Sequence, residues 1–387
     1  MEETLSGKLF VNSRQVGDYI DITMPEDGKK PEEQIRIHYL EAGMGEPLLL
    51  IHGLGQSLYT WRDLFAELSE SYRVIAIDLP GHGYSDRPEY FCYSMDEMAE
   101  AIRLFLDEKE IISAHMIGFS TGAMYMLRLL TMHPDYVANC IAISPGGISK
   151  QMPSLIRSLK SPLKAVFTRN LFSFGDVKKC LQECFYDQTV IDDRVVNQYY
   201  MPLADGYTRE ALMYAVQNFD LHSVTEQLKE TDHEILLLWG KEDRWHLPNS
   251  SVFYQSILQN GRYFLVRNAG HIVQEDTPEK LYQVILSYIP SATYGYYPPQ
   301  YFSYDRDTRE QEVYSGEMTE PEVPEEEPEI PEEEPETPEE EPEAPEEEPE
   351  TGAEAAGEES GEAEETPMEK EEQKQENSSE KQDDGEL

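Results

Sequence analysis

The sequence predicts an α/β fold in which a mostly parallel sheet is covered by helices on both faces. Fully apolar runs such as residues 48–51, 74–77 and 235–238 are short and end in polar or glycine residues, which is typical of buried parallel strands. Helical patterns separate these runs, and this alternation gives a doubly wound sheet with right-handed crossovers. About 290 residues precede an acidic tail, enough for one large domain with an insertion.

The first part of the chain, residues 1–147, supplies strands and helices in turn. Ser94 and Glu97 form a capping box that starts one of the helices. The expected strands are residues 8–23, 35–41, 48–51, 74–77, 115–117 and 137–144, and the expected helices are residues 59–68, 94–107 and 123–132.

The alternation stops between residues 148 and 231. This stretch has no strand-like run and is rich in Phe, Tyr, Met and Leu. An all-helical insertion in such a sheet is most simply a lid over the strand ends. Helical segments are expected around residues 155–159, 177–185, 195–200 and 212–219.

The sheet resumes in residues 232–290. Strands are expected at residues 234–240 and 263–266, with a helix near 251–258 between them. Thr277 and Pro278 predict the start of the last helix, with an N-cap residue followed by proline at the first helical position.

The remaining chain has a different composition. A Tyr- and Pro-rich linker covers residues 291–316, and residues 317–387 carry 33 acidic and 3 basic side chains. A unit Pro-Glu-Glu-Glu-Pro-Glu-X repeats from Pro324 to Thr351. Such a segment cannot bury enough apolar surface to offset its chain entropy, so we expect a disordered, extended tail. It acts as a solubilising extension or, in a sharper interpretation, docks a basic partner or binds Ca²⁺ weakly.

Charge and cysteine content limit the possible partners and the compartment. The tail accounts for −30 of the formal charge of −46, and the acidic remainder argues against nucleic acid or an anionic membrane as partner. No signal peptide or membrane-spanning run is visible. Cys180 and Cys184 share an apolar helical face with Val177, Leu181 and Phe185, which favours core cysteines over a disulfide or metal site. We therefore expect a cytoplasmic protein.

One short stretch of the sequence indicates a catalytic nucleophile. Gly118-Phe119-Ser120-Thr121-Gly122 lies between an expected strand and an expected helix. A serine between two glycines at such a turn forms a nucleophile elbow, in which the strained backbone lifts the hydroxyl clear of the sheet. The motif is weak by itself, so the partners of Ser120 must decide its meaning.

Further motifs occur in a fixed order around this turn. They are His52-Gly53-x-Gly55, Asp78-x-x-Gly81-x-Gly83-x-Ser85, Gly118-x-Ser120-x-Gly122, Gly240-x-x-Asp243 and Gly270-His271. Together they resemble the α/β-hydrolase superfamily over about residues 35–290, leaving out the lid. The resemblance implies a mostly parallel eight-stranded sheet with an inserted helical lid.

The residues themselves suggest a catalytic triad of Ser120, His271 and Asp243. A serine hydroxyl needs a base to become a nucleophile at neutral pH, and histidine is the usual base. His271 follows an expected strand and a glycine, and Asp243 follows the preceding strand. The order Ser, Asp, His along the chain is the one that the resemblance implies.

Other residues are weaker candidates for these roles. Glu242 adjoins Asp243, but strand alternation points it elsewhere, and residues 144–147 offer no carboxylate where some members of the superfamily place the acid. His246 and His222 are possible bases, but neither follows a strand end, and we expect both at the surface or in the lid. His115 and His133 are expected to be structural, and His52 and His82 to support loop backbone.

The resemblance also implies an oxyanion hole made of two backbone amides, those of Thr121 and Leu54. Each such donor stabilises the transition state by about 3 kcal/mol. No cofactor and no metal ion is implied.

The predicted function is hydrolysis of a carboxylic ester or thioester through an acyl-enzyme on Ser120. Members of the superfamily that open epoxides or remove halide use Asp at the elbow, so Ser120 argues against both reactions. Two alternatives stay open: cleavage of a carbon–carbon bond next to a ketone with the same triad, and a non-catalytic binding protein. We expect a small-molecule ester-type substrate with an apolar group. The aromatic lid residues either contact that group or simply form the core of the lid.

Overall fold

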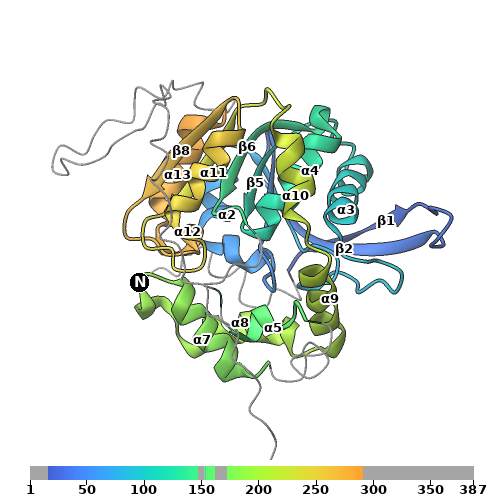
Figure 1. Cartoon of the computed structure of the whole chain (residues 1–387), viewed down its shortest axis with the longest axis horizontal. Helices are drawn as coiled ribbons and strands as arrows, with labels where there is room; N and C mark the ends of the chain where they lie inside the picture. The colour runs from blue at the N-terminus through green and yellow to red at the C-terminus, as the bar shows by residue number, and fades with distance from the viewer. Residues whose placement is uncertain (1–15, 147–151, 153, 162–171, 291–387) are drawn as a thin grey trace, which may run out of the picture. The chain divides into compact units, whose positions relative to one another are not determined.

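The computed structural model describes residues 16–146, 152, 154–161 and 172–290. Its centre is an eight-stranded sheet in the order β1-β2-β4-β3-β5-β6-β7-β8 (Figure 1). The β1–β2 and β2–β4 pairs are antiparallel and the other pairs are parallel. The strands are β1 (Asp18–Met24), β2 (Glu33–Ala42), β3 (Pro47–Ile51), β4 (Arg73–Ile77), β5 (Ala114–Phe119), β6 (Val137–Ile143), β7 (Ile235–Gly240) and β8 (Gly261–Val266).

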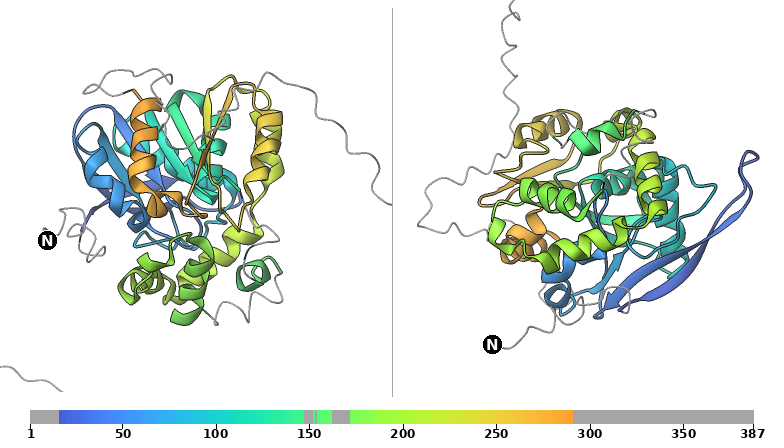
Figure 2. Two further views of the ribbon diagram at one scale, coloured as in Figure 1. Left: turned by 90° about the vertical axis from the view of Figure 1, so that its left-hand side faces the viewer. Right: turned by 90° about the horizontal axis from the view of Figure 1, so that it is seen from below.

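Helices cover both faces of this sheet, as predicted (Figure 2). On β3, Leu48 and Leu50 pack toward α2 (Arg62–Leu68) and α13 (Pro278–Tyr288). Leu49 and Ile51 point the other way, toward the layer of α3 (Met95–Glu108), α4 (Thr121–Met132) and α11 (Ser251–Ile257). Successive side chains of a strand alternate between its faces, so an entirely apolar strand can serve two cores at once.

The described residues between β6 and β7 contain helices and no strand. We call this segment the helical insert. Figure 1 shows most of its helices gathered at one edge of the sheet, whereas the last one lies beside α4. They are α5 (Ser154–Ser158), α7 (Phe174–Cys184), the 3₁₀ helix η4 (Gln188–Val190), α8 (Asp193–Leu203), α9 (Gly206–Gln217) and α10 (Leu221–Leu228).

One of these helices, α10, was not expected from the sequence. Only two of its side chains, Val224 and Leu228, reach the core formed around α4. Two apolar residues four positions apart are too few to reveal a helical period among the polar residues between them, so the sequence pattern does not predict this helix.

Several boundaries differ from the sequence predictions. The first strand begins at Asp18, and residues 8–15 lie outside the described part. Thr277 holds the N-cap position of α13, but its hydroxyl donates to Val273 O of a preceding short helix, α12 (Val273–Asp276), and does not cap. Ser94 accepts from Glu97 N as predicted, whereas the Glu97 carboxylate accepts from Cys92 N.

Three further sequence predictions concern the C-terminal region, membrane-spanning helices and the cysteines. The linker at residues 291–316 and the tail at residues 317–387 lie outside the described residues. None of the helices in the described ranges has the length and apolar character needed to cross a bilayer. Cys92, Cys140, Cys180 and Cys184 are all free thiols, with Cys184 buried on α7.

Candidate active site

Ser120 lies at the sharp turn between β5 and α4. Its backbone has φ 52° and ψ −118°, a left-handed conformation that non-glycine residues rarely adopt. A Cβ on Gly122 would lie 2.1 Å from His52 O, and one on Gly118 would lie 2.5 Å from Ala123 Cα. The two flanking glycines are therefore required because backbone passes too closely for any side chain.

The structure brings the three predicted triad residues together. His271 Nε2 lies 3.2 Å from Ser120 Oγ, and His271 Nδ1 lies 2.8 Å from Asp243 Oδ2. The side chains come from the ends of β5, β7 and β8, and the residues are only 5%, 2% and 2% exposed for Ser120, Asp243 and His271. An unbroken hydrogen-bond chain thus joins hydroxyl, imidazole and carboxylate.

Asp243 is held as an anion by its own loop. Its Oδ1 accepts from Trp245 N at 2.8 Å and from His246 N at 2.9 Å. Burial raises the pKa of the carboxyl, but the imidazole of His271, together with the ring and the backbone N–H of His246, outweighs burial and holds the pKa below its ordinary value. An ionised carboxylate only accepts, so Nδ1 of His271 carries the proton and Nε2 is left to accept from Ser120.

Aromatic rings surround the imidazole of His271. Phe119 and His246 lie 4.9 Å from it and Trp245 lies 5.5 Å from it, measured between ring centroids. The backbone N–H of His271 donates to Cys184 O at 2.7 Å. These contacts fix the ring and keep water away from it.

The expectation that His246 lies at the surface or in the lid is wrong. It is 6% exposed and its Nδ1 lies 3.1 Å from Ser144 O. The turn that begins at Asp243 folds residues 245 and 246 back beneath the triad, because the aspartate side chain captures their backbone N–H groups. An aspartate directly after a buried strand was the available signal for this turn. His222, by contrast, is exposed on α10 as predicted.

Glu242 points away from the triad, as strand alternation predicts. Its carboxylate accepts from Ala269 N at 3.1 Å.

The predicted oxyanion donors lie beside Ser120. Thr121 is the first residue of α4, so its N–H has no acceptor within the helix and lies at the positive end of the helix dipole. Leu54 lines the same cavity as Ser120. A Cβ on Gly53 would lie 3.2 Å from the Ser120 Cβ, so the Leu54 loop passes directly over the nucleophile.

Two buried histidines support the loops around the site. His52 Nδ1 lies 2.8 Å from Gly53 O, and its Nε2 accepts from Leu79 N. His82 Nδ1 lies 3.0 Å from Pro80 O. Burial lowers the pKa of both rings, that of His82 to about 3, so both stay neutral and act through hydrogen bonds. His115 on β5 and His133 after α4 take no part in the site.

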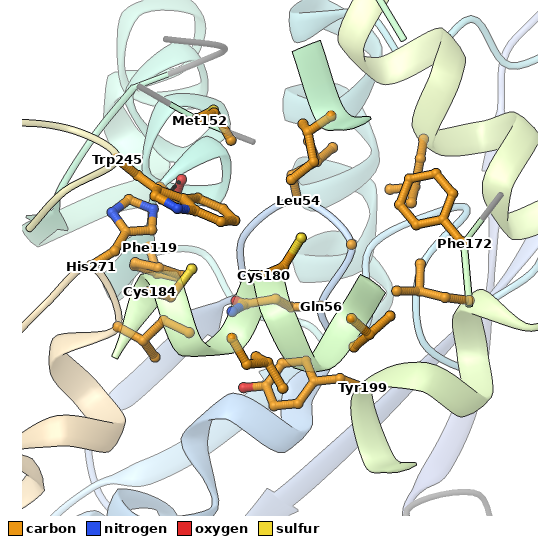
Figure 3. Close-up of a pocket in the computed structure, with 18 of the residues that line it drawn as sticks. Leu54, Gln56, Phe119, Met152, Phe172, Cys180, Cys184, Tyr199, Trp245 and His271 are labelled. Atoms are coloured by element: carbon orange, nitrogen blue, oxygen red, sulfur yellow. Dashed lines mark hydrogen bonds between the residues drawn. The ribbon is translucent and has the colours of Figure 1, made fainter. Parts of the chain in front are cut away.

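A cavity of about 90 Å³ opens onto Ser120 and His271. Figure 3 shows His271 and Trp245 side by side at one end and Phe172 at the other. Among the described residues that line it there is no Lys, Arg, Asp or Glu. The core contributes Leu54, Gly55, Gln56, Phe119, Ser120, Trp245, His271 and Ile272, and the helical insert contributes Met152, Ile156, Leu159, Phe172, Val177, Cys180, Leu181, Cys184, Tyr199, Leu203 and Leu212.

The described residues contain no group of three or more His, Cys, Asp or Glu side chains that could hold a metal ion.

Comparisons with known proteins extend these observations. A sequence model of a family described as alpha/beta hydrolase fold matches residues 46–278. The uncharacterized hydrolase YugF of Bacillus subtilis (strain 168) is 25% identical over 253 residues, covering 65% of this chain and 92% of the relative. The 2-hydroxymuconate semialdehyde hydrolase of Pseudomonas sp. (strain CF600) is 26% identical over 267 residues, covering 67% and 92%.

Solved structures show the same fold. A meta-cleavage product hydrolase from Pseudomonas fluorescens IP01 superposes with a TM-score of 0.56 at 23% identity, covering 65% of this chain and 93% of the other.

Proposed function

This chain belongs to the α/β-hydrolase family, and we propose that it is a serine hydrolase of small apolar carboxylic esters or thioesters. The observation that carries the proposal is the hydrogen-bond chain from Ser120 through His271 to Asp243, which ends at an apolar cavity. This arrangement is that of an activated nucleophile with an oriented base.

The acylation step follows from the protonation states. His271 Nε2 takes the Ser120 proton as Oγ attacks the ester carbonyl, and Asp243 stabilises the imidazolium that forms. The amides of Thr121 and Leu54 hold the carbonyl oxygen as it becomes negative. His271 then gives its proton to the departing alkoxide or thiolate, leaving Ser120 acylated.

Deacylation repeats these roles with water as the nucleophile. His271 takes a proton from water, the hydroxide adds to the acyl carbonyl, and Ser120 leaves with the proton returned by His271. The products are a carboxylic acid and the regenerated enzyme.

The cavity lining favours an ester over the carbon–carbon bond alternative. The relative named 2-hydroxymuconate semialdehyde hydrolase acts on a molecule whose name includes a carboxylate. A buried carboxylate needs a cation or several donors to replace water, and no described lining residue is Lys or Arg. At about 90 Å³ the cavity is also smaller than the ~150 Å³ that holds benzene, so we expect short acyl groups.

A fluorophosphonate probe and p-nitrophenyl esters of increasing acyl length test the proposal. We expect covalent labelling at Ser120, hydrolysis with a preference for short chains, and loss of both in Ser120→Ala. Full turnover by Ser120→Ala would contradict the mechanism, and the absence of any adduct would support the non-catalytic alternative. Faster cleavage of a vinylogous diketone than of any ester would favour the carbon–carbon reaction.

A further inference from the structure

The loop that carries His271 is bound to the helical insert through its backbone. His271 N donates to Cys184 O, the last residue of α7, at 2.7 Å. A Cβ on Gly270 would lie 2.2 Å from the same oxygen. The backbones of these two segments are therefore in direct contact, with no side chain between them. The backbone of the catalytic base therefore takes its hydrogen-bond acceptor from the insert and not from the sheet.

A single carboxylate reinforces this junction. Asp276 Oδ2 accepts from Gly270 N at 2.7 Å, in the His271 loop. The same carboxylate accepts from Tyr186 N at 3.0 Å and from Asp187 N at 3.1 Å, in the insert just after α7. Three backbone donors from two separate segments thus converge on one side chain.

The preceding residue, Glu275, makes a second connection on the buried side of α12. It accepts from Thr60 Oγ1 at 2.6 Å, from the Tyr199 hydroxyl of α8, and from Arg62 of α2. Tyr199 also lines the cavity. Adjacent carboxylates of α12 therefore hold two parts of the insert. Asp276 holds the segment just after α7, and Glu275 holds α8 through Tyr199.

We propose that Asp276 is a positioning residue that couples the docking of the helical insert to the placement of His271. This inference rests on the proposed function, since it concerns the base of that reaction. When the insert is docked, Asp276 and Cys184 O together fix the backbone on which the imidazole stands. When the insert lifts to admit substrate, the same bonds break and the base loses its reach to Ser120.

The coupling has a chemical benefit. His271 can accept the Ser120 proton only when the cavity is closed. Ser120 is therefore not activated while the open cavity is in contact with bulk water. The Nε2–Oγ separation of 3.2 Å is at the long end of a hydrogen bond, and a small shift of the loop is enough to break it.

The test compares Asp276→Asn with Asp192→Ala. Asp192 accepts from Arg194 N and Val195 N at the start of α8, so its loss loosens the first turn of that helix without touching the His271 loop. We expect Asp276→Asn to lower kcat about 10- to 100-fold, with KM for a short ester changed less than 3-fold, and Asp192→Ala to leave kcat unchanged.

Hydrogen–deuterium exchange supplies a readout that does not depend on turnover. In Asp276→Asn, residues 184–188 and 269–272 should lose protection together, whereas in Asp192→Ala only α8 should. Wild-type kcat in Asp276→Asn, or faster exchange in the insert alone, would overturn the proposal. If the wild-type protein neither hydrolyses esters nor reacts with fluorophosphonate, the proposed function fails, and the exchange data still decide whether the two segments are coupled.

Discussion

The two walls of the cavity are built in different ways. On the core wall, Ser120 and His271 stand at strand ends, with Asp243 behind His271, and the backbone at Gly53 and Gly122 lies within contact distance of its neighbours. On the insert wall, apolar side chains of the helices line the cavity, such as Val177 and Leu181 of α7. The first wall fixes atoms for chemistry, and the second sets the size of what fits.

The largest effect is expected at the acid of the core wall. Asp243→Asn should lower kcat by about 10⁴-fold, because an amide can donate to Nδ1 and so favour the wrong tautomer of His271. Steady-state kinetics with a short p-nitrophenyl ester measure this loss. Glu242→Gln, next to it in the chain, is the matched control. Glutamine keeps an oxygen that can accept from Ala269 N, so kcat should stay within a few-fold of wild type.

Two glycines, one next to Ser120 and one in α7, test whether the core is packed more tightly than the insert. Gly122→Ala should destabilise the protein by about 2–3 kcal/mol, because its Cβ would lie 2.1 Å from His52 O. Gly175→Ala, in α7 of the insert, meets nothing closer than 3.7 Å and should stabilise it by up to about 1 kcal/mol. Urea denaturation gives both values, and equal effects would show that the core wall is not packed as described.

The buried histidines of the core predict sensitivity to acid. The folded pKa of His82 is about 3, below its ordinary value of 6.5, so the native state binds fewer protons than the unfolded state. The free energy of unfolding should therefore fall as the pH drops from about 6.5 to 3, by up to about 1.4 kcal/mol per pH unit for this group.

Denaturation curves at pH 7, 5 and 4 measure that slope. His82→Gln should make it shallower. His222→Gln in the insert should not, because His222 is exposed in the folded protein. Identical slopes for His82→Gln and wild type would remove His82 as the cause.

The insert wall should control chain length. Leu181→Ala enlarges the cavity and should raise the hexanoate-to-acetate ratio of kcat/KM about 10-fold. Leu64→Ala deletes an equally buried leucine of α2 that does not line the cavity, so it should destabilise the fold and leave the ratio alone. An unchanged ratio in Leu181→Ala would mean that the acyl group binds elsewhere.

The smallest effect is expected from the acidic tail. Deleting residues 317–387 should leave ester hydrolysis within a few-fold of wild type. Complete loss of activity would make the tail part of the enzyme.

Sequence patterns predicted the core far better than the insert. Apolar runs such as residues 48–51 and the glycines around Ser120 carry local signals, because a buried strand and a strained turn each admit few residue types. In the insert, α10 was missed and only approximate helical segments were expected, since packing against α4 decides that helix and not its own periodicity.

The Glu275 and Asp276 contacts could not have been read from the sequence. Apart from Gly270 N, their partners lie between 76 and 215 residues away and include backbone N–H groups, which any residue can supply. The buried place of His246 was missed for a related reason, because a turn held by the Asp243 side chain determines it.

The bond from His271 N to Cys184 O bears on how such a protein can be recombined. An exchange of the helical insert between family members must keep the path of the backbone at residue 184, because the position of that carbonyl, and not its side chain, supplies the acceptor for His271 N. A chimera that keeps native residues through Asp187 retains that carbonyl and both amide donors to Asp276. A crossover placed earlier in the chain leaves the position of that carbonyl to the foreign segment.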